Sequence, residues 1–288
     1  MGVLSRLKIF LLTKLNAHLG AYKLIYYLAH LRQALFRGAP RAAAAGALQP
    51  PPHRIFVGRG DFSAVGEDFL GYFKDLCGLR PDERVLDVGC GIGRMAIPLT
   101  KYLNREGSYE GIDIVKEGID WCNRHIKSKY PNFSFQWVDV YNKVYNPQGR
   151  IAARAYRFTS EDESFDFVFQ VSVVTHMPPD DMENYVRETA RVLRTGGRCL
   201  ITFFLWNVES ARLVAAGKSR FKFKYELEGH RAEYVSAPEV AVCYDESTVL
   251  SIFNKCGLKV KQPIIYGSWC GRAGRPGIYQ DMVVAWKG

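Results

Sequence analysis

The sequence predicts an α/β protein built on a doubly wound, largely parallel β-sheet. From residue 67 onward, short apolar runs of strand length alternate with amphipathic stretches of helical length. Strands separated by helical patterns of roughly 10–15 residues are typical of parallel strands joined by crossover helices. The first apolar run, VLDVGCGIG at residues 85–93, ends in three alternate glycines. A glycine turn after the first strand is typical of sheets that bind nucleotides.

Local signals set the expected elements of the first half. EDFLGYFKDLCGL at residues 67–79 has helical spacing of apolar residues, and Arg80-Pro81-Asp82 ends that helix. RVLDVG at residues 84–89 is short and apolar, as expected of a buried strand. We expect further strands at 108–114 and 133–140, and helices at 94–103 and 118–130.

The second half continues the alternation and then closes the sheet. SFDFVFQVSVV at residues 164–174 predicts a fourth strand, and residues 180–193 predict a helix. Arg194-Thr195-Gly196-Gly197 follows as a glycine stop signal, since glycine favours helix C-termini. We then expect a strand at 198–204, a hairpin within 221–244, a helix at 245–256, and closing strands at 258–266 and 279–287.

Charge is distributed unevenly along the 288 residues. The formal net charge is +10, yet residues 1–60 hold nine Lys or Arg side chains and no carboxylate. Residues 61–288 carry 30 basic and 29 acidic side chains and are therefore close to neutral. A nucleic-acid-binding domain would be expected to carry a basic surface of its own. The charge pattern therefore indicates a basic arm on a neutral domain, with no nucleic-acid partner.

The chain divides into an arm, a linker and a domain. Residues 1–37 are predicted to form a basic amphipathic helical arm, and residues 38–54, rich in Ala, Gly and Pro, are predicted to be a linker. Residues 55–288 form the main domain, with an inserted, cap-like region at about 207–244. Three interpretations of the arm remain open: a helix docked on the domain or on a second copy, a helix lying on an anionic membrane surface, or a transit peptide.

Cysteine usage and hydropathy bear on the location of the protein. The seven cysteines are scattered and form no Cys-x-x-Cys pair, which favours neither a disulfide framework nor a metal site. No apolar stretch reaches about 18 residues, so no transmembrane helix is predicted. The N-terminus lacks a compact apolar secretion signal. We expect a cytoplasmic protein, associated with the cytoplasmic face of a membrane if the arm binds lipid.

Three carboxylates help to choose among nucleotide cofactors. Gly91-Ile92-Gly93-Arg94-Met95-Ala96 fits a dinucleotide pattern, so a nicotinamide cofactor remains an alternative. Asp87 precedes the turn by two residues, where a carboxylate favours an ammonium group and repels a pyrophosphate. Asp113 ends the second strand, where it can accept both ribose hydroxyls, and Asp139 ends the third, where it can accept an adenine amino group. S-adenosylmethionine carries all three groups.

Five motifs in order resemble a known family. VLDVGCGIG, EGIDI, QWVDV, SFDFVFQVSVVTHM and VLRTGG are similar to the class I S-adenosylmethionine-dependent methyltransferases, in the small-molecule branch of methyltransferase types 11 and 25. The resemblance covers roughly residues 66–206. It implies the Rossmann-like methyltransferase fold, with a seven-stranded sheet whose last strand is antiparallel, and transfer of a methyl group from S-adenosylmethionine.

The resemblance also implies cofactor-binding positions. The turn would hold the methionine end, Asp113 with Ile114 the ribose, Asp139 with Val140 the adenine, and Gln170 would make a main-chain contact. The turn positions are Asp87, Gly89, Cys90, Gly91 and Gly93. YNPQGRIAARAYRF at residues 145–158 is a longer connection than the family needs, and the arm and the cap-like region fall outside the resemblance.

Methyl transfer requires alignment of the acceptor and, for a hydroxyl or an acidic carbon, a general base. His176 follows the fourth strand at the methyl end of the site and is the candidate base; the alternative is a histidine that packs the loop before Pro178-Pro179. His230 and Tyr244 are weaker candidates, and Trp269 with Arg272 either lines an acceptor pocket or shapes a turn. We expect a small-molecule or lipid-linked acceptor, with an oxygen nucleophile, and no metal. A nicotinamide-dependent oxidoreductase and a non-catalytic cofactor-binding partner subunit are the alternatives.

Overall fold

The computed structural model describes residues 48–56, 58, 60–234, 238–273 and 277–288. The predicted arm at 1–37 and most of the predicted linker lie outside the described residues. Within them, no helix is both long enough and apolar enough to cross a membrane.

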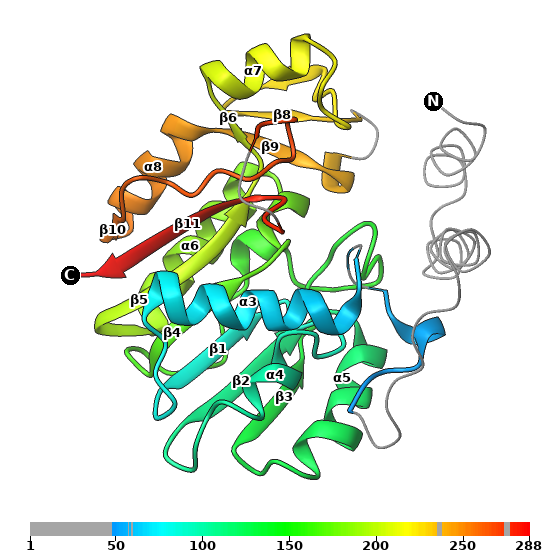
Figure 1. Ribbon diagram of the computed structural model, residues 1–288, viewed down its shortest axis with the longest axis vertical. Helices are drawn as coiled ribbons and strands as arrows, with labels where there is room; N and C mark the ends of the chain where they lie inside the picture. Colours follow the sequence, from blue (N-terminus) through cyan, green and yellow to red (C-terminus); the bar gives the residue numbers. More distant parts are fainter. Residues whose placement is uncertain (1–47, 57, 59, 235–237, 274–276) are drawn as a thin grey trace.

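A seven-stranded sheet forms the centre of the molecule (Figure 1). Its strand order is β10-β11-β5-β4-β1-β2-β3, and β11 is antiparallel to both of its neighbours while the remaining pairs are parallel. The predicted doubly wound sheet with an antiparallel last strand is therefore confirmed. The strands are β1 Arg84–Val88, β2 Ser108–Asp113, β3 Phe133–Trp137, β4 Phe165–Gln170, β5 Leu193–Phe203, β10 Leu258–Val260 and β11 Asp281–Lys287.

Helices cover both faces of this sheet (Figure 1). One face packs against α6 and α8, and the other packs against α3, α4 and α5. Successive residues of a strand point to opposite faces of the sheet. In β1, Val85 therefore packs in the core beneath α3, α4 and α5, whereas Leu86 and Val88 pack in the core beneath α6 and α8. The helices of the sheet layers are α3 Phe62–Cys77, α4 Ala96–Leu99, α5 Lys116–Cys122, which continues as a π-helical turn at Asn123–Lys127, α6 Pro179–Val192 and α8 Glu246–Lys255.

Two local predictions were wrong. The helix expected at 94–103 is reduced to the four residues of α4, with turns on either side. The glycine stop signal at Gly196-Gly197 does not end a helix, because α6 ends at Val192 and β5 begins at Leu193. These glycines lie in β5 itself, where the pairing with β4 shifts register and Gly196 has a φ of +76°. Glycine permits such a bulge as readily as it ends a helix.

The cap-like region forms a second, four-stranded sheet next to the main one. After β5 only Phe204 intervenes before β6 Leu205–Trp206, so this small sheet extends from the carboxyl end of β5. The hairpin expected within 221–244 is present, since β8 pairs antiparallel with both β7 and β9. The other elements are α7 Val208–Ala215, β7 Tyr225–Leu227, β8 His230–Ala232 and β9 Val242–Asp245.

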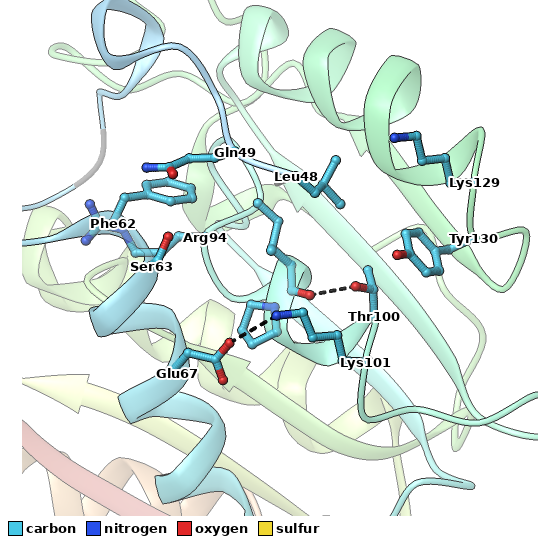
Figure 2. Close-up of a pocket in the computed structure, with 12 residues that line it drawn as sticks. Leu48, Gln49, Phe62, Ser63, Glu67, Arg94, Thr100, Lys101, Lys129 and Tyr130 are labelled. Atoms are coloured by element: carbon cyan, nitrogen blue, oxygen red, sulfur yellow. Dashed lines mark hydrogen bonds and ion pairs between the residues drawn. The ribbon is translucent and has the colours of Figure 1, made fainter. Parts of the chain in front are cut away.

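Residues 48–54, counted in the predicted linker, lie against the main domain. They include a 3-10 turn at Pro52–Arg54, and Pro50 is buried. Leu48 packs against the core under α3, α4 and α5 and, with Gln49, lines a cavity of about 290 Å³ (Figure 2). The ordered domain therefore begins before residue 55.

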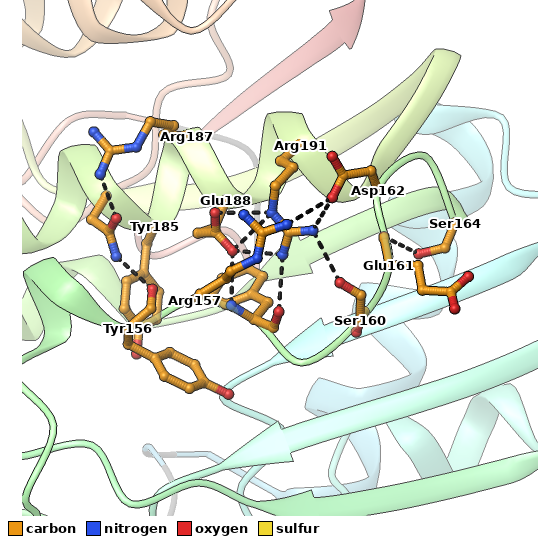
Figure 3. Close-up of polar contacts among 12 residues, drawn as sticks. Tyr156, Arg157, Ser160, Glu161, Asp162, Ser164, Tyr185, Arg187, Glu188 and Arg191 are labelled. Atoms are coloured by element: carbon orange, nitrogen blue, oxygen red, sulfur yellow. Dashed lines mark hydrogen bonds and ion pairs between the residues drawn. The ribbon is translucent and has the colours of Figure 1, made fainter.

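The long connection between β3 and β4 is held by a partly buried arginine. Arg191 of α6 donates from Nε and Nη2 to the carboxylate of Glu188 and from Nη1, at 2.6 Å, to Asp162 (Figure 3). It also donates to the carbonyls of Phe158 and Ser160. Asn184 of α6 binds two carbonyls farther back in the same connection, those of Ala153 and Tyr156. The extra length of this segment is thus fixed against α6.

Candidate active site

The glycine turn after β1 adopts a backbone conformation that other residues rarely take. Gly89, Gly91 and Gly93 have φ values of +86°, +57° and +81°. At Gly89 a Cβ atom would lie 2.3 Å from Cγ2 of Val173, so space as well as conformation requires glycine. The turn lies where β1 separates β4 on one side from β2 on the other. Ligands of open α/β sheets bind at such a switch point.

The N–H groups of this turn are already used within the protein. Those of Gly89 and Cys90 donate to the carbonyl of Ile112, and that of Gly93 donates to the carbonyl of Cys90. Gly91 donates to the carboxylate of Asp113. The four-residue α4 begins only at Ala96, so it does not supply the helix N-terminus that a pyrophosphate requires. Donors for a dinucleotide are therefore engaged, which disfavours the nicotinamide interpretation.

Asp113 ties the end of β2 to the glycine turn. Its Oδ2 accepts the N–H of Gly91 and its Oδ1 accepts the N–H of Val115, both at 2.7 Å. Burial raises the pKa of Asp113 to about 6, although these hydrogen bonds act in the opposite direction. Each carboxylate oxygen retains a lone pair for a further donor. The neighbouring Ile114 is half-buried, and its carbonyl accepts a hydrogen bond from the Trp137 indole at 3.0 Å.

Asp87 lies beneath the turn and is almost fully buried. Its Oδ2 accepts a 2.6 Å hydrogen bond from the hydroxyl of Tyr109 in β2. Burial raises the pKa of Asp87 well above its ordinary value, which the Tyr109 hydrogen bond only partly offsets. Cys90 is buried beside these residues. Asp87 therefore ties β1 to β2 just before the turn, and a direct contact with an ammonium group stays a prediction.

Asp139 follows β3 and is paired with a residue that sequence reasoning missed. The Arg150 guanidinium lies 2.5 Å from Oδ2 of Asp139, and the carbonyl of Asp139 accepts the N–H groups of Arg150 and Ile151. Val140 is buried and forms a bridge with Ile151. The long connection thus folds back onto the predicted adenine site. No local sequence signal links positions 139 and 150; the unusual length of the connection was the available clue.

Gln170 ends β4 with its side chain turned toward α6. Its Nε2 donates to the hydroxyl of Thr189 at 2.8 Å, and the side chain is fully buried. Its Oε1 has no hydrogen-bond partner among the described residues. The side chain anchors α6 to the sheet, and the predicted main-chain contact with a cofactor stays a prediction.

His176 lies in a 3-10 turn, Val174–His176, beyond the carboxyl end of β4. Its Nδ1 is 2.8 Å from the carbonyl of Glu239, and its ring meets that of Tyr145 edge to face at 5.5 Å. Because a carbonyl only accepts, Nδ1 carries the proton and Nε2 holds the lone pair of the neutral ring. Burial lowers the pKa of His176, so the ring is neutral at pH 7. The neutral form of the ring is the one that accepts a proton.

The remaining candidates have structural partners. Trp269 is buried and its indole donates to Asp281 at 2.7 Å, while Arg272 pairs with Asp281 and Glu209. These contacts favour the interpretation of the two as turn-shaping residues. The buried Tyr244 hydroxyl donates to the carbonyl of Met177, and His230 contacts the carbonyl of Glu228 in its own hairpin.

The structure brings the predicted positions to one edge of the sheet. The turn, Asp113, Asp139 and His176 follow β1, β2, β3 and β4, and these four strands are parallel neighbours. The cavity of Figure 2 lies elsewhere, between the starts of α3 and α4 and the end of α5, and none of these residues lines it. Within the described part of the chain, no cluster of His, Cys, Asp or Glu has a metal-binding arrangement.

Comparison with known families decides the class of this site. Residues 85–197, from β1 to the start of β5, match the family model described as a methyltransferase domain. This part of the chain is a methyltransferase domain, similar to those of the S-adenosylmethionine-dependent methyltransferases. S-adenosylmethionine is therefore the cofactor of this methyltransferase domain, as the three carboxylates predicted, and the match includes every predicted cofactor-binding position.

Curated relatives and solved structures agree with the methyltransferase domain. The 27-O-demethylrifamycin SV methyltransferase of Amycolatopsis mediterranei is 29% identical over 174 residues, 57% of this chain and 57% of that protein. Phosphoethanolamine N-methyltransferase 3 of Arabidopsis thaliana is 28% identical over 52% of this chain and 26% of its own. The chain thus spans little more than half of one relative and about a quarter of the other. Magnesium protoporphyrin IX methyltransferase from Synechocystis with bound S-adenosylhomocysteine shares the fold, with a TM-score of 0.50 at 15% identity over 81% of this chain and 90% of that one.

Proposed function

We propose that this protein transfers a methyl group from S-adenosylmethionine to a small-molecule acceptor. The main support for this proposal is the glycine turn. The N–H groups of Gly89, Cys90, Gly91 and Gly93 already donate hydrogen bonds within the protein, and the acceptor for Gly91 is the buried carboxylate of Asp113. Such a site offers acceptors of hydrogen bonds, which suit an ammonium group and a ribose diol better than a pyrophosphate. The turn, Asp113 with Ile114, Asp139 with Val140, and Gln170 would hold the cofactor, which supplies an activated methyl group on a sulfonium.

The acceptor is proposed to react through oxygen. The relatives are named for several acceptors, among them a rifamycin oxygen, a phosphoethanolamine nitrogen and arsenite, and all of these are small molecules. An amine in its neutral form needs no base, whereas a hydroxyl must lose a proton as it attacks. His176, neutral and held through Nδ1 by the Glu239 carbonyl, presents Nε2 for that proton.

The cap-like region would enclose the acceptor side of the site. The Glu239 carbonyl that orients His176 belongs to this region, and Tyr145, which contacts the His176 ring, belongs to the long connection after β3. His176 therefore lies between the two segments that depart most from the family pattern. Together these two segments would align the acceptor with the methyl group and exclude water. Alignment and exclusion of water account for much of the rate enhancement in methyl transfer, because the sulfonium is already a good leaving group.

Titration with S-adenosylhomocysteine, NAD and NADP tests the cofactor. We expect binding of S-adenosylhomocysteine alone, and tight binding of a nicotinamide cofactor would instead indicate an oxidoreductase. Transfer of radiolabelled methyl groups to a deproteinised small-molecule extract tests the catalysis. Binding of S-adenosylhomocysteine without any transfer would favour a non-catalytic partner subunit.

Contact with the cytoplasmic face of a membrane, through residues 1–37, is part of the same proposal. Those residues hold Lys and Arg but no carboxylate, and each basic side chain near an anionic surface contributes about 1 kcal/mol. A lipid-linked acceptor would then be reached at the membrane. Removal of residues 1–37 should abolish binding to anionic liposomes and leave the affinity for S-adenosylhomocysteine unchanged; undiminished liposome binding would refute the role of the arm.

A further inference from the structure

A basic pocket lies on the outer side of α5, away from the predicted cofactor positions. Its volume is about 520 Å³. The segment 48–54 forms one wall and the helical stretch from α5 to Lys129 forms the other. Phe56, just beyond that segment, lies so close to Gly118 of α5 that a Cβ there would be 3.0 Å from its ring. The lining residues are Leu48, Gln49, Pro51, Arg54, Trp121, Arg124, His125 and Lys129.

The lining of this pocket is cationic and contains no carboxylate. Arg54, Arg124 and Lys129 make no ion pair with any Asp or Glu in the described ranges. The positions outside those ranges include no Asp or Glu at all. On the same helix, Lys116 does pair with a carboxylate, that of Asp120. The pocket therefore gathers three cations whose charge no carboxylate of the described ranges offsets.

We propose that this pocket binds a phosphate group carried by a larger organic molecule. Two guanidinium groups and an ammonium match the oxygens of a phosphate, and arginine does so with paired N–H donors. Small-molecule pockets measure roughly 300–1,000 Å³, so the volume of about 520 Å³ accommodates more than an inorganic ion. The half-buried ring of His125, stacked at 4.9 Å on the buried ring of Trp121, provides a flat surface for the organic part.

The sequence around this segment is free of negative charge. Leu48, the first described residue, lines the pocket, and the preceding 47 residues hold seven Lys or Arg side chains and no carboxylate. The first carboxylate of the chain is that of Asp61, so no residue before it would repel a bound phosphate. The neighbouring cavity of Figure 2 shares Leu48, Gln49 and Lys129 but also contains Glu67, which pairs with Lys101. Of the two cavities, the pocket beside α5 is therefore the one that no carboxylate lines.

Charge reversal at one lining residue, with a matched neighbour as control, tests the proposal. Arg124→Glu places a carboxylate in the pocket, whereas Lys127→Glu makes the same kind of charge change on an exposed side chain of the same helical turn that does not line it. The full chain is titrated with glycerol 3-phosphate and, separately, sedimented with phosphatidylglycerol vesicles, with phosphatidylcholine vesicles as the neutral reference. Arg54→Gln, on the opposite wall, provides a second variant.

We expect the affinity for the phosphate probe to fall about tenfold or more with Arg124→Glu and Arg54→Gln, and by less than about twofold with Lys127→Glu. Binding of glycerol 3-phosphate assigns a free organic phosphate, and binding of the anionic vesicles alone assigns a lipid headgroup. Unchanged affinity for S-adenosylhomocysteine in all three variants checks that the domain is folded. Equal losses with Arg124→Glu and Lys127→Glu, or no binding of either probe by the native chain, would overturn the proposal.

Discussion

Asp113, at the carboxyl end of β2, accepts the main-chain N–H of Gly91 at 2.7 Å and thereby closes the glycine turn that follows β1. Its second oxygen accepts the N–H of Val115 in the next connection. One side chain thus fixes the turn on one strand to the loop on its neighbour. Because β1 and β2 are adjacent and parallel, this link sets the distance between the two predicted halves of the cofactor site.

Replacing Asp113 by Asn should weaken cofactor binding. An amide presents one acceptor and one donor, so one of the two N–H groups now bound by Asp113 faces another donor. A buried unsatisfied donor costs about 1–3 kcal/mol, which corresponds to about a tenfold to hundredfold loss of affinity for S-adenosylhomocysteine by titration calorimetry. Asp120→Asn, which removes an exposed ion pair with Lys116, is the control. Equal affinities of the two variants would contradict the role of Asp113.

Gly89→Ala should destabilise the domain for a steric reason that a second substitution relieves. Both Gly89 and Gly196 have a positive φ, but a Cβ at Gly89 would lie 2.3 Å from Val173 whereas a Cβ at Gly196 would meet nothing within 4 Å. We expect urea unfolding to show a loss about 1–3 kcal/mol greater for Gly89→Ala than for Gly196→Ala. The double variant with Val173→Ala should recover part of that difference. Identical losses at the two glycines would show that space at Gly89 is unimportant.

His176→Ala should lower kcat by about 10²–10⁴-fold while leaving the affinity for S-adenosylhomocysteine unchanged. Transfer of tritiated methyl groups to the small-molecule fraction measures the rate. His176→Asn, which keeps a donor for the Glu239 carbonyl but has no basic nitrogen, should be as slow as the alanine variant. His230→Ala, at a histidine that contacts a carbonyl of its own hairpin, is the control. Full activity of the asparagine variant would assign His176 a purely structural role.

The pH dependence of stability should change when Asp87 is replaced by Asn. The pKa of Asp87 is raised in the folded protein by burial, so its contribution to stability is complete below the unfolded pKa and is lost as the pH rises through the folded pKa. Asparagine does not titrate and still accepts from Tyr109. Relative to the native chain, the variant should therefore gain stability in urea unfolding as the pH rises above about 4, the ordinary pKa of an aspartate. Asp82→Asn, at an exposed carboxylate, should show no such gain.

The central strands were predictable because their residues are apolar on both faces and bounded by turn residues. The position of Asp113 and Asp139 at the carboxyl edge of the sheet was predictable because each comes at or just after the end of such a strand. The length of α4 was not, because the residues at 94–103 have helical spacing whether or not the main chain continues as helix. Gly196 and Gly197 were misassigned because a glycine pair signals a helix end and a strand bulge equally well.

The hydrogen-bond partners of the candidate site residues could not be predicted from the sequence, for a different reason. Arg150 meets Asp139 only because the intervening connection folds back, and Glu239 meets His176 through a carbonyl, which every residue possesses. Tyr109 supports Asp87 from the next strand, where a tyrosine reads as an ordinary core residue. Contacts between segments that are far apart in sequence produce no local pattern, so a single sequence does not reveal them.

The small sheet is joined to the main domain through a stem made of two short strands, β6 and β9. The chain leaves the main domain at Trp206 and returns at Val242, and β6 and β9, which flank this excursion, are adjacent and parallel. Asp281 of β11 binds the main chain of Leu205 at the point of departure. An excursion whose two ends meet on a fixed stem can be exchanged for another of different length while the glycine turn is left intact. Evolution, or a designer grafting a foreign cap, can therefore vary this region and leave the glycine turn unchanged.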